Sequence, residues 1–216
     1  MAALANTSTS GEPSSTMSLT TVTCSMYFVV ADASSATNTG QGDLQVTFSR
    51  GYRRLNLIVD GGFESYDECE DFCFSETSAN WVGTSPAGGY LDASIFFFTT
   101  YARSGNVTAL LGSATFADDK SGTLQVAKPL DTEAGKKYQI AFFQNSAFSG
   151  PTFQAKSIVA VLWNGKVVET IKPGFTEWKF HSVNVEAAGS DVLAFRGGAA
   201  PAWTFVDDIS VWPMFQ

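Results

Sequence analysis

The residues best able to do chemistry in this sequence are acidic, and they concentrate in one short segment. That segment carries six carboxylates: Glu64, Asp67, Glu68, Glu70, Asp71 and Glu76. Hydrolysis of a glycosidic bond needs two carboxyl groups on either side of the sugar, about 5 to 9.5 Å apart. Neighbouring carboxylates in one hydrophilic segment indicate instead a solvated surface or a site for a cation.

Other groups that could take part in catalysis are few, because the chain has a single histidine. His181 lies in the segment 178–185, where alternation places it on the face of Val183 and Val185 and predicts a partly buried imidazole. The Gly-x-Ser-x-Gly pattern of a nucleophilic serine does not occur, since the nearest segment, 83–87, ends in alanine. We therefore expect that the protein is not an enzyme.

Aromatic side chains near turns suit a different task, the binding of a glycan. A sugar is held by flat apolar faces, with a few amide, hydroxyl or carboxylate groups at the edge to fix its hydroxyls. The candidate ligand-binding residues are Trp81, Tyr90, Tyr101, Gln144, Asn145 and Trp203. Each of them could also anchor a loop to the core. For Trp163 and Trp178 we expect a place in the core.

Charge and composition limit the possible partners. The formal net charge of -8 argues against nucleic acid, whose affinity for proteins comes mainly from Lys and Arg. No stretch approaches the roughly 20 apolar residues that span a bilayer, so we expect no membrane span. Charged residues are only 16% of the chain, and Thr, Val and aromatic residues suit a pleated, half-buried surface. This composition is typical of secreted β-proteins.

Two of the three cysteines, Cys69 and Cys73, are four residues apart. Their spacing predicts a small disulfide-closed loop and hence an oxidising, extracellular compartment. A zinc site is the alternative, but it needs about four ligands and the chain offers three cysteines and one histidine. Cys24 is left over as a buried thiol. We recognise no signal peptide, since the apolar run 26–31 is short and no basic residues precede it.

Short apolar runs between turn signals predict an all-β protein, an antiparallel β-sandwich of the jelly-roll type. Asn164-Gly165 between two such runs predicts a hairpin. The expected strands of the main domain, 55–216, are 56–59, 95–101, 122–127, 137–144, 157–163, 167–172, 177–186, 191–197 and 203–212. Residues 1–54 form a Ser/Thr-rich extension that bears strands at 20–30 and 43–49, separated by a polar stretch. The run 95–98 is apolar on both faces and predicts a central, doubly covered strand or a subunit contact.

Several motifs, in order along about residues 55 to 212, resemble those of galactose-binding-domain-like jelly rolls, especially secreted carbohydrate-binding modules. They include Asn56-Leu57-Ile58-Val59-Asp60-Gly61-Gly62-Phe63-Glu64, Ala109-Leu110-Leu111-Gly112, Trp163-Asn164-Gly165 and Phe205-Val206-Asp207-Asp208-Ile209-Ser210-Val211. The resemblance implies that the first motif lies beside the last. Residues 1–54 lie outside it.

The resemblance also implies a structural calcium ion near the paired first and last strands. By motif position its ligands would be Glu64 together with Asp207, or Asp208. Calcium takes six to eight hard oxygens, so the residue types suit it. Alternatively, Glu64 and Asp207 hydrogen-bond backbone groups at the strand ends.

These observations predict a non-catalytic, extracellular, glycan-binding domain. The rival interpretation is a structural subunit of an extracellular fibre, coat or adhesive layer, a homo-oligomer or polymer in which the N-terminal extension adds a strand to a neighbour. Exposed sheet edges template such pairing.

Overall fold

The computed structural model describes residues 33–38, 44–48, 56–66, 69, 71–116, 118–198 and 202–214, and the chain divides into two units, Met1–Arg53 and Arg54–Gln216. In the first unit, β1 (Ala33–Asn38) pairs with β2 (Leu44–Phe48) in an antiparallel hairpin. The strand expected at 43–49 is confirmed. The polar stretch before it was wrongly expected to break the strands, because backbone pairing does not require apolar alternation. The strand expected at 20–30 lies outside the described residues.

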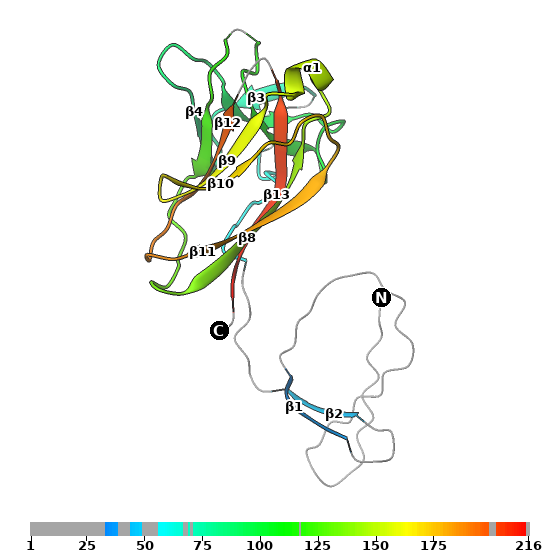
Figure 1. Ribbon diagram of the computed structural model, residues 1–216, viewed down its shortest axis with the longest axis vertical. Coiled ribbons are helices and arrows are strands. Elements are labelled where there is room, and N and C mark those ends of the chain that lie inside the picture. Colours follow the sequence, from blue (N-terminus) through cyan, green and yellow to red (C-terminus); the bar gives the residue numbers. More distant parts are fainter. Residues whose placement is uncertain are drawn as a thin grey trace. The chain divides into compact units, whose positions relative to one another are not determined.

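Two antiparallel sheets make up the second unit (Figure 1). Across the first sheet the order is β10 (Lys166–Ile171), β9 (Ile158–Trp163), β12 (Leu193–Gly198), β7 (Thr123–Val126) and β4 (Trp81–Thr84). Across the second it is β11 (Lys179–Glu186), β8 (Lys137–Asn145), β13 (Thr204–Pro213), β6 (Val107–Leu111), β5 (Ala93–Phe97) and β3 (Cys73–Ser75). The one helix among the described residues is α1 (Pro151–Gln154). The jelly-roll sandwich is confirmed.

Alternate residues of both sheets fill the space between the layers. On β8, Ile140 and Phe142 point inward and are fully buried, as are Val161 and Phe195 from the facing sheet. The rings of Phe142 and Phe195 meet edge to face, with centroids 4.9 Å apart. Burying one such side chain contributes about 1.5 to 3 kcal/mol, so this layer supplies much of the driving force for folding.

A second apolar cluster covers the opposite face of the six-stranded sheet. Phe96, Leu110, Trp203 and Phe205 are buried there beneath loops, while Ile95, next to Phe96, belongs to the core between the sheets. Neighbouring strand residues point to opposite faces, so β5 is covered on both sides, as expected. It lies one place from the sheet edge and not at the centre.

The segment before β3 lies beside β13, as the resemblance implied. Leu57 N–H donates to Val211 O (2.9 Å), and Ile209 N–H donates to Gly61 O (2.9 Å). The Asn56 side chain accepts the Val211 N–H (2.8 Å), in place of a backbone carbonyl. The prediction of a strand at 56–59 is therefore wrong, because a side chain and scattered backbone bonds replace a continuous ladder.

The other predicted strands of this unit are confirmed to within a few residues. Asn164 and Gly165 have φ of 53° and 74° and connect β9 to β10, as the hairpin signal required. Strands β3 and β4 were not predicted, because they are only three and four residues long. Strand β6 was also absent from the predicted strands, although Ala109-Leu110-Leu111-Gly112 belongs to the motifs of the resemblance.

Gly61 has no room for a side chain, which yields a direct test of the pairing with β13. A Cβ atom there would lie 1.8 Å from Ile209 O, whereas one at Gly62 would meet nothing closer than 3.6 Å. Gly61→Ala should therefore lower the free energy of unfolding by about 1 to 3 kcal/mol, and Gly62→Ala should change it by less than about 1 kcal/mol. Urea unfolding of both variants measures this, and equal effects would contradict the pairing.

Candidate functional site

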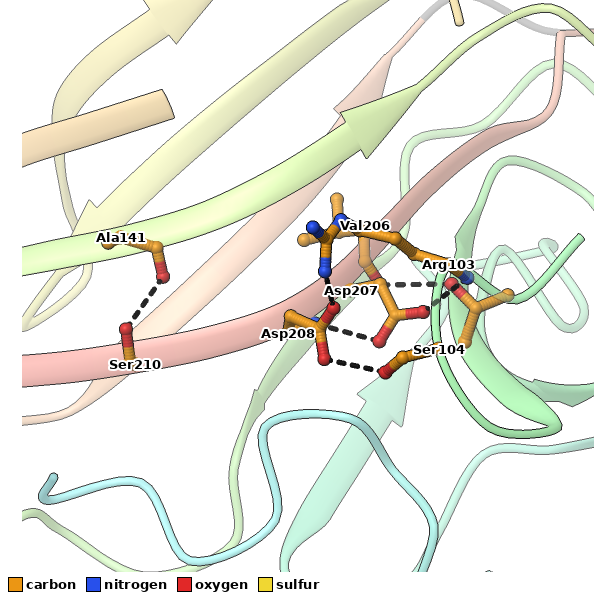
Figure 2. Close-up of polar contacts among 8 residues, drawn as sticks. Arg103, Ser104, Ala141, Val206, Asp207, Asp208 and Ser210 are labelled. Carbon is orange, nitrogen blue, oxygen red and sulfur yellow. Dashed lines mark hydrogen bonds and ion pairs between the residues drawn. The ribbon is translucent and has the colours of Figure 1, made fainter. Parts of the chain in front are cut away.

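A group of carboxylates gathers where β13 is irregular. The pairing of β13 with β8 shifts register between Asp207 and Ser210, and Asp208 adopts a positive φ of 50°. Figure 2 shows that this bulge turns both aspartates toward the loop that carries Arg103 and Ser104. Asp208 pairs with the Arg103 guanidinium and accepts the Ser104 hydroxyl (2.8 Å). A bulge thus converts a strand position into a polar anchor for a distant loop.

Asp207 is fully buried and is held by backbone donors. Its carboxylate accepts the N–H of Arg103 (2.8 Å) and that of Asp208 (2.7 Å). Burial raises the pKa of Asp207 to about 7; the Arg103 N–H opposes the increase and the Asp208 charge adds to it. The bonds at this carboxylate do not fully replace its lost hydration.

Glu64 fixes the other end of the same loop. Its carboxylate accepts the N–H groups of Asn106 and Val107, each at 2.9 Å. Gly105 has a φ of 64°, and a Cβ atom there would lie 2.3 Å from the Glu64 carboxyl carbon. Only glycine allows the loop to approach this closely.

The structure brings the three expected calcium ligands together around Gly62. An ideal Cβ atom on Gly62 would lie 3.6 Å from Asp208 Oδ1, 3.8 Å from Asp207 Oδ1 and 3.9 Å from Glu64 Cγ. Oxygen donors of this kind suit calcium. Within the described residues, no three acidic, cysteine or histidine side chains are arranged to hold an ion as they stand. Calcium binding would require these oxygens to exchange loop hydrogen bonds for the ion, and it stays a prediction.

Three parallel rings form the second notable feature. Trp203 lies between Phe116, with centroids 4.7 Å apart, and Phe148, 4.6 Å apart, both within 14° of parallel. The Trp203 indole N–H donates to Ser113 O (2.8 Å), and its backbone N–H donates to the Ser149 hydroxyl (2.9 Å). Trp203 is therefore buried and fixed, and its neighbours present the aromatic surface.

A groove of about 370 Å³ adjoins this stack, lined by Phe116, Phe148, Ser149 and Phe153. The three phenylalanines are 50%, 36% and 52% exposed, respectively. Phe153 belongs to α1, which is tied to the stack because the Gln154 amide donates to Trp203 O. Phe116 has a φ of 55°, a conformation that costs energy for a bulky residue and often marks a functional position.

Tyr101 and Asn145, two of the expected ligand contacts, belong to this region. Tyr101 is half-buried, stacks on Phe205 (5.2 Å) and meets Phe148 edge-on (4.8 Å). Asn145 is buried; its amide donates to Glu177 (3.4 Å) and its carbonyl accepts Ala147 N–H. Tyr101 packs against the aromatic cluster, and Asn145 fixes the backbone just before Phe148.

Trp81, Gln144 and Tyr90 lie elsewhere, and two of them are buried. Trp81 is fully buried against Phe63 (5.1 Å), with its indole N–H donating to Asp60 O (2.6 Å). Gln144 is also fully buried, and its amide has no hydrogen-bond partner among the described residues. Gln144 presents no surface to a ligand, whereas Trp81 belongs to the lining of a separate pocket of about 270 Å³, beside Asn80 and Lys128. A ligand contact by Trp81 stays a prediction. Tyr90 is exposed.

Sequence reasoning did not single out Phe116, Phe148 and Phe153. The signal available was the run Ser146-Ala147-Phe148-Ser149-Gly150-Pro151-Thr152-Phe153, in which two phenylalanines flank a turn that a soluble surface would fill with polar residues. Without a structure, such residues are indistinguishable from loop anchors.

The remaining expectations concern cysteine, histidine and tryptophan. The Cys69–Cys73 disulfide is confirmed. His181 is half-buried and stacks on Phe142 (5.4 Å); burial first, and then Lys179, lower its pKa. Trp163 packs in the core as expected, and Trp178 packs against the second cluster. None of the helices in the described part of the chain is long and apolar enough to cross a membrane.

Comparisons with solved structures find matches at low sequence identity. An arabinose-bound α-L-arabinofuranosidase, MgGH51, matches with a TM-score of 0.51 at 12% identity over 76% of this chain, which spans 27% of that enzyme. The module TmCBM61 in complex with β-1,4-galactotriose matches with a TM-score of 0.46 at 14% identity, covering 74% of this chain and 99% of the module.

The CBM22-1 xylan-binding domain of Paenibacillus barcinonensis Xyn10C matches with a TM-score of 0.41 at 11% identity, covering 68% of this chain and 99% of that domain. No known family model matches the sequence, and no curated protein sequence does. At 12% identity, the match to MgGH51 is a likeness of fold alone.

The gathering of Glu64, Asp207 and Asp208 leads to a test for calcium. If the ion binds this cluster, excess calcium should raise the melting temperature relative to chelator, because a ligand at about 100 times its Kd adds about 2.7 kcal/mol. The increase should shrink in Asp207→Asn and persist in the control Asp131→Asn, whose side chain is exposed. Thermal unfolding with calcium or EGTA measures it. An increase of equal size in Asp207→Asn and wild type would remove the ion from this cluster.

Proposed function

We propose that the unit Arg54–Gln216 is a non-catalytic glycan-binding domain that holds its ligand against the groove of Phe116, Phe148 and Phe153. The observation that carries this proposal is the convergence of three large, exposed aromatic side chains on one groove. Isolated exposed apolar residues are common on proteins, but a group lining a concavity marks a binding surface.

The groove has the chemistry that a sugar requires. Its size lies near the lower end of small-molecule pockets, about 300 to 1,000 Å³, and suits a short stretch of a glycan. The phenylalanine faces can stack on the C–H face of a pyranose. The Ser149 hydroxyl accepts the Trp203 N–H and still has its own proton to donate to a sugar oxygen.

The groove lining supports a binding role without catalysis. Its four residues contain no group that exchanges protons near neutral pH. Two of the carboxylates described above, Glu64 and Asp207, accept backbone hydrogen bonds and anchor a loop. The disulfide Cys69–Cys73 supports an extracellular location, since such bonds persist in oxidising compartments.

Assembly into a fibre or layer is the second candidate. One observation favours it: β10 lies at a sheet edge and exposes Val167 (47%) and Val168 (39%). An edge with apolar side chains can pair with a strand of another chain. That strand would come from the N-terminal extension, of which the structure describes β1 and β2.

Aromatic truncation tests the glycan proposal. Phe116→Ala and Phe153→Ala should each weaken binding to neutral β-linked oligosaccharides at least about tenfold, because losing a stacked ring costs about 1.4 kcal/mol or more. Phe180→Ala is the matched control: Phe180 is 55% exposed but lies on β11, outside the groove. Isothermal titration of β-1,4-galactan and xylan oligosaccharides measures the affinities. If Phe180→Ala weakens binding as much as the groove variants do, or no oligosaccharide binds, the proposal is wrong.

A further inference from the structure

Asp92, which immediately precedes β5, is a fully buried carboxylate outside the groove and outside the cluster of Figure 2. Its backbone is well bonded: its N–H donates to the Ser85 hydroxyl (2.9 Å) and its carbonyl accepts the Gly112 N–H (2.9 Å). Its side chain is not, because neither carboxylate oxygen has a hydrogen-bond partner among the described residues. Buried charges normally have hydrogen-bond donors or an opposite charge as partners, so the Asp92 carboxylate needs such a partner.

Another aspartate of the same unit shows what a satisfied buried carboxylate looks like. Asp191 is also fully buried, but it accepts hydrogen bonds from the side chains of Thr132 and Asn164 and from the N–H groups of Ala188 and Gly189. Burial acts to raise the pKa of Asp191, yet these bonds outweigh it and the pKa is lowered. The chain can thus solvate a buried aspartate with several of its own donors, whereas at Asp92 the effect of the Ser85 hydroxyl is smaller than that of burial.

Two charged groups act on Asp92, the Asp118 carboxylate and the Lys120 ammonium. Burial first, and then the Asp118 carboxyl group, raise the pKa of Asp92 to about 6. Asp118 is held in place by the N–H of Lys120 (2.9 Å) and that of Tyr90, and chiefly the Lys120 N–H lowers its pKa. Two carboxyl groups therefore face each other: Asp118 is held by backbone N–H groups, whereas Asp92 has only the opposing effects of the Ser85 hydroxyl and Lys120, which do not offset its burial.

The surroundings of this pair leave it short of positive charge. The Lys120 side chain passes Gly88 and Gly89, and its charge acts on both carboxylates. It forms no ion pair with either of them within 4.0 Å, since among the described residues that contact is made by Arg103 with Asp208. Glu76, which accepts the Ser85 hydroxyl (3.3 Å), adds a further negative charge nearby. With both aspartates ionised, the pair and Lys120 together carry one net negative charge.

The chain also packs closely around the Asp92 carboxylate. A Cβ atom on Gly89 would lie 2.0 Å from Asp92 Oδ2, so only glycine lets the backbone cover it. The covering segment is a turn in which Gly89 N–H donates to Pro86 O (2.8 Å) and Gly88 has a φ of 74°. Such turns leave other backbone carbonyls free to act as ligands, and calcium sites commonly combine these with carboxylates.

We propose that Asp92 and Asp118 bind a divalent cation, with calcium as the matching ion, in a site separate from Glu64, Asp207 and Asp208. The ion supplies the positive charge that Asp92 lacks, and its remaining oxygen ligands come from backbone carbonyls and water. It ties the glycine-rich segment 83–89 to the segment that carries Phe116, two residues before Asp118. The proposal does not depend on glycan binding.

The test counts the calcium ions bound by the full chain. Equilibrium dialysis with radiolabelled calcium alone, at neutral pH, compares wild type with Asp92→Asn and Asp118→Asn, which keep side-chain size and remove charge. Each variant should lose one equivalent of bound calcium, or bind that equivalent at least about tenfold more weakly. Asp119→Asn is the matched control, because Asp119 is the exposed neighbour of Asp118.

Asp207→Asn separates the two sites, since it should leave the Asp92 equivalent in place. The proposal is overturned if wild type binds no calcium, or if Asp92→Asn and Asp118→Asn bind as much as wild type. It is also overturned if all bound calcium disappears with Asp207→Asn and none with Asp118→Asn. Asp118 is partly exposed, so its variant decides the matter even where Asp92→Asn fails to fold.

Discussion

Strand β13 is the constraint on which the rest of the second unit depends. It lies between β8 and β6, and its side chains are buried on both faces: Val206, Ile209 and Val211 in the core, Phe205 in the second aromatic cluster. Along the same strand the segment 56–61 adds its own backbone bonds. A strand that is committed on both faces cannot shift by one residue, because every side chain would change sides. The bulge at Asp207 therefore ends one register and begins another at a defined place.

The position of β13 determines the shape of the groove lined by Phe116, Phe148 and Phe153. Trp203 lies one residue before β13 and is held by Ser113, Ser149 and Gln154, so it contributes no free face of its own. It serves instead as the fixed centre against which Phe116 and Phe148 stack. Aromatic side chains held this way lose little conformational freedom when a ligand arrives, which is how a small surface achieves useful affinity.

Alternation along the sequence was enough to find the long strands, and the turn signal Asn164-Gly165 located the hairpin. The meeting of the first and last motifs was implied by the resemblance to known jelly rolls. It failed where an aromatic residue's environment is set by distant partners. Trp81 borders a glycine-rich turn and resembles a loop residue, yet β4 pairs with β7 and Phe63 covers the indole. Phe116 and Phe153 show the reverse: no periodicity marks them, and only the meeting of two loops with α1 exposes them on one groove. Burial is a property of the assembled sheets and is not encoded in local spacing.

Three fully buried aspartates show how this acidic chain handles charge. Asp191 has four sources of hydrogen bonds, Asp207 has backbone donors from its own strand and a distant loop, and Asp92 has another carboxylate. The first needs nothing further, since its donors already outweigh the effect of burial on its pKa. Asp207 is intermediate, since burial still raises its pKa although backbone N–H groups bind it. Its hydrogen bonds explain its role in anchoring the loop of Arg103. For the third, the fold provides a glycine cover, a facing carboxylate and the weak help of the Ser85 hydroxyl and Lys120, and an ion of opposite charge is the component that would complete such a site.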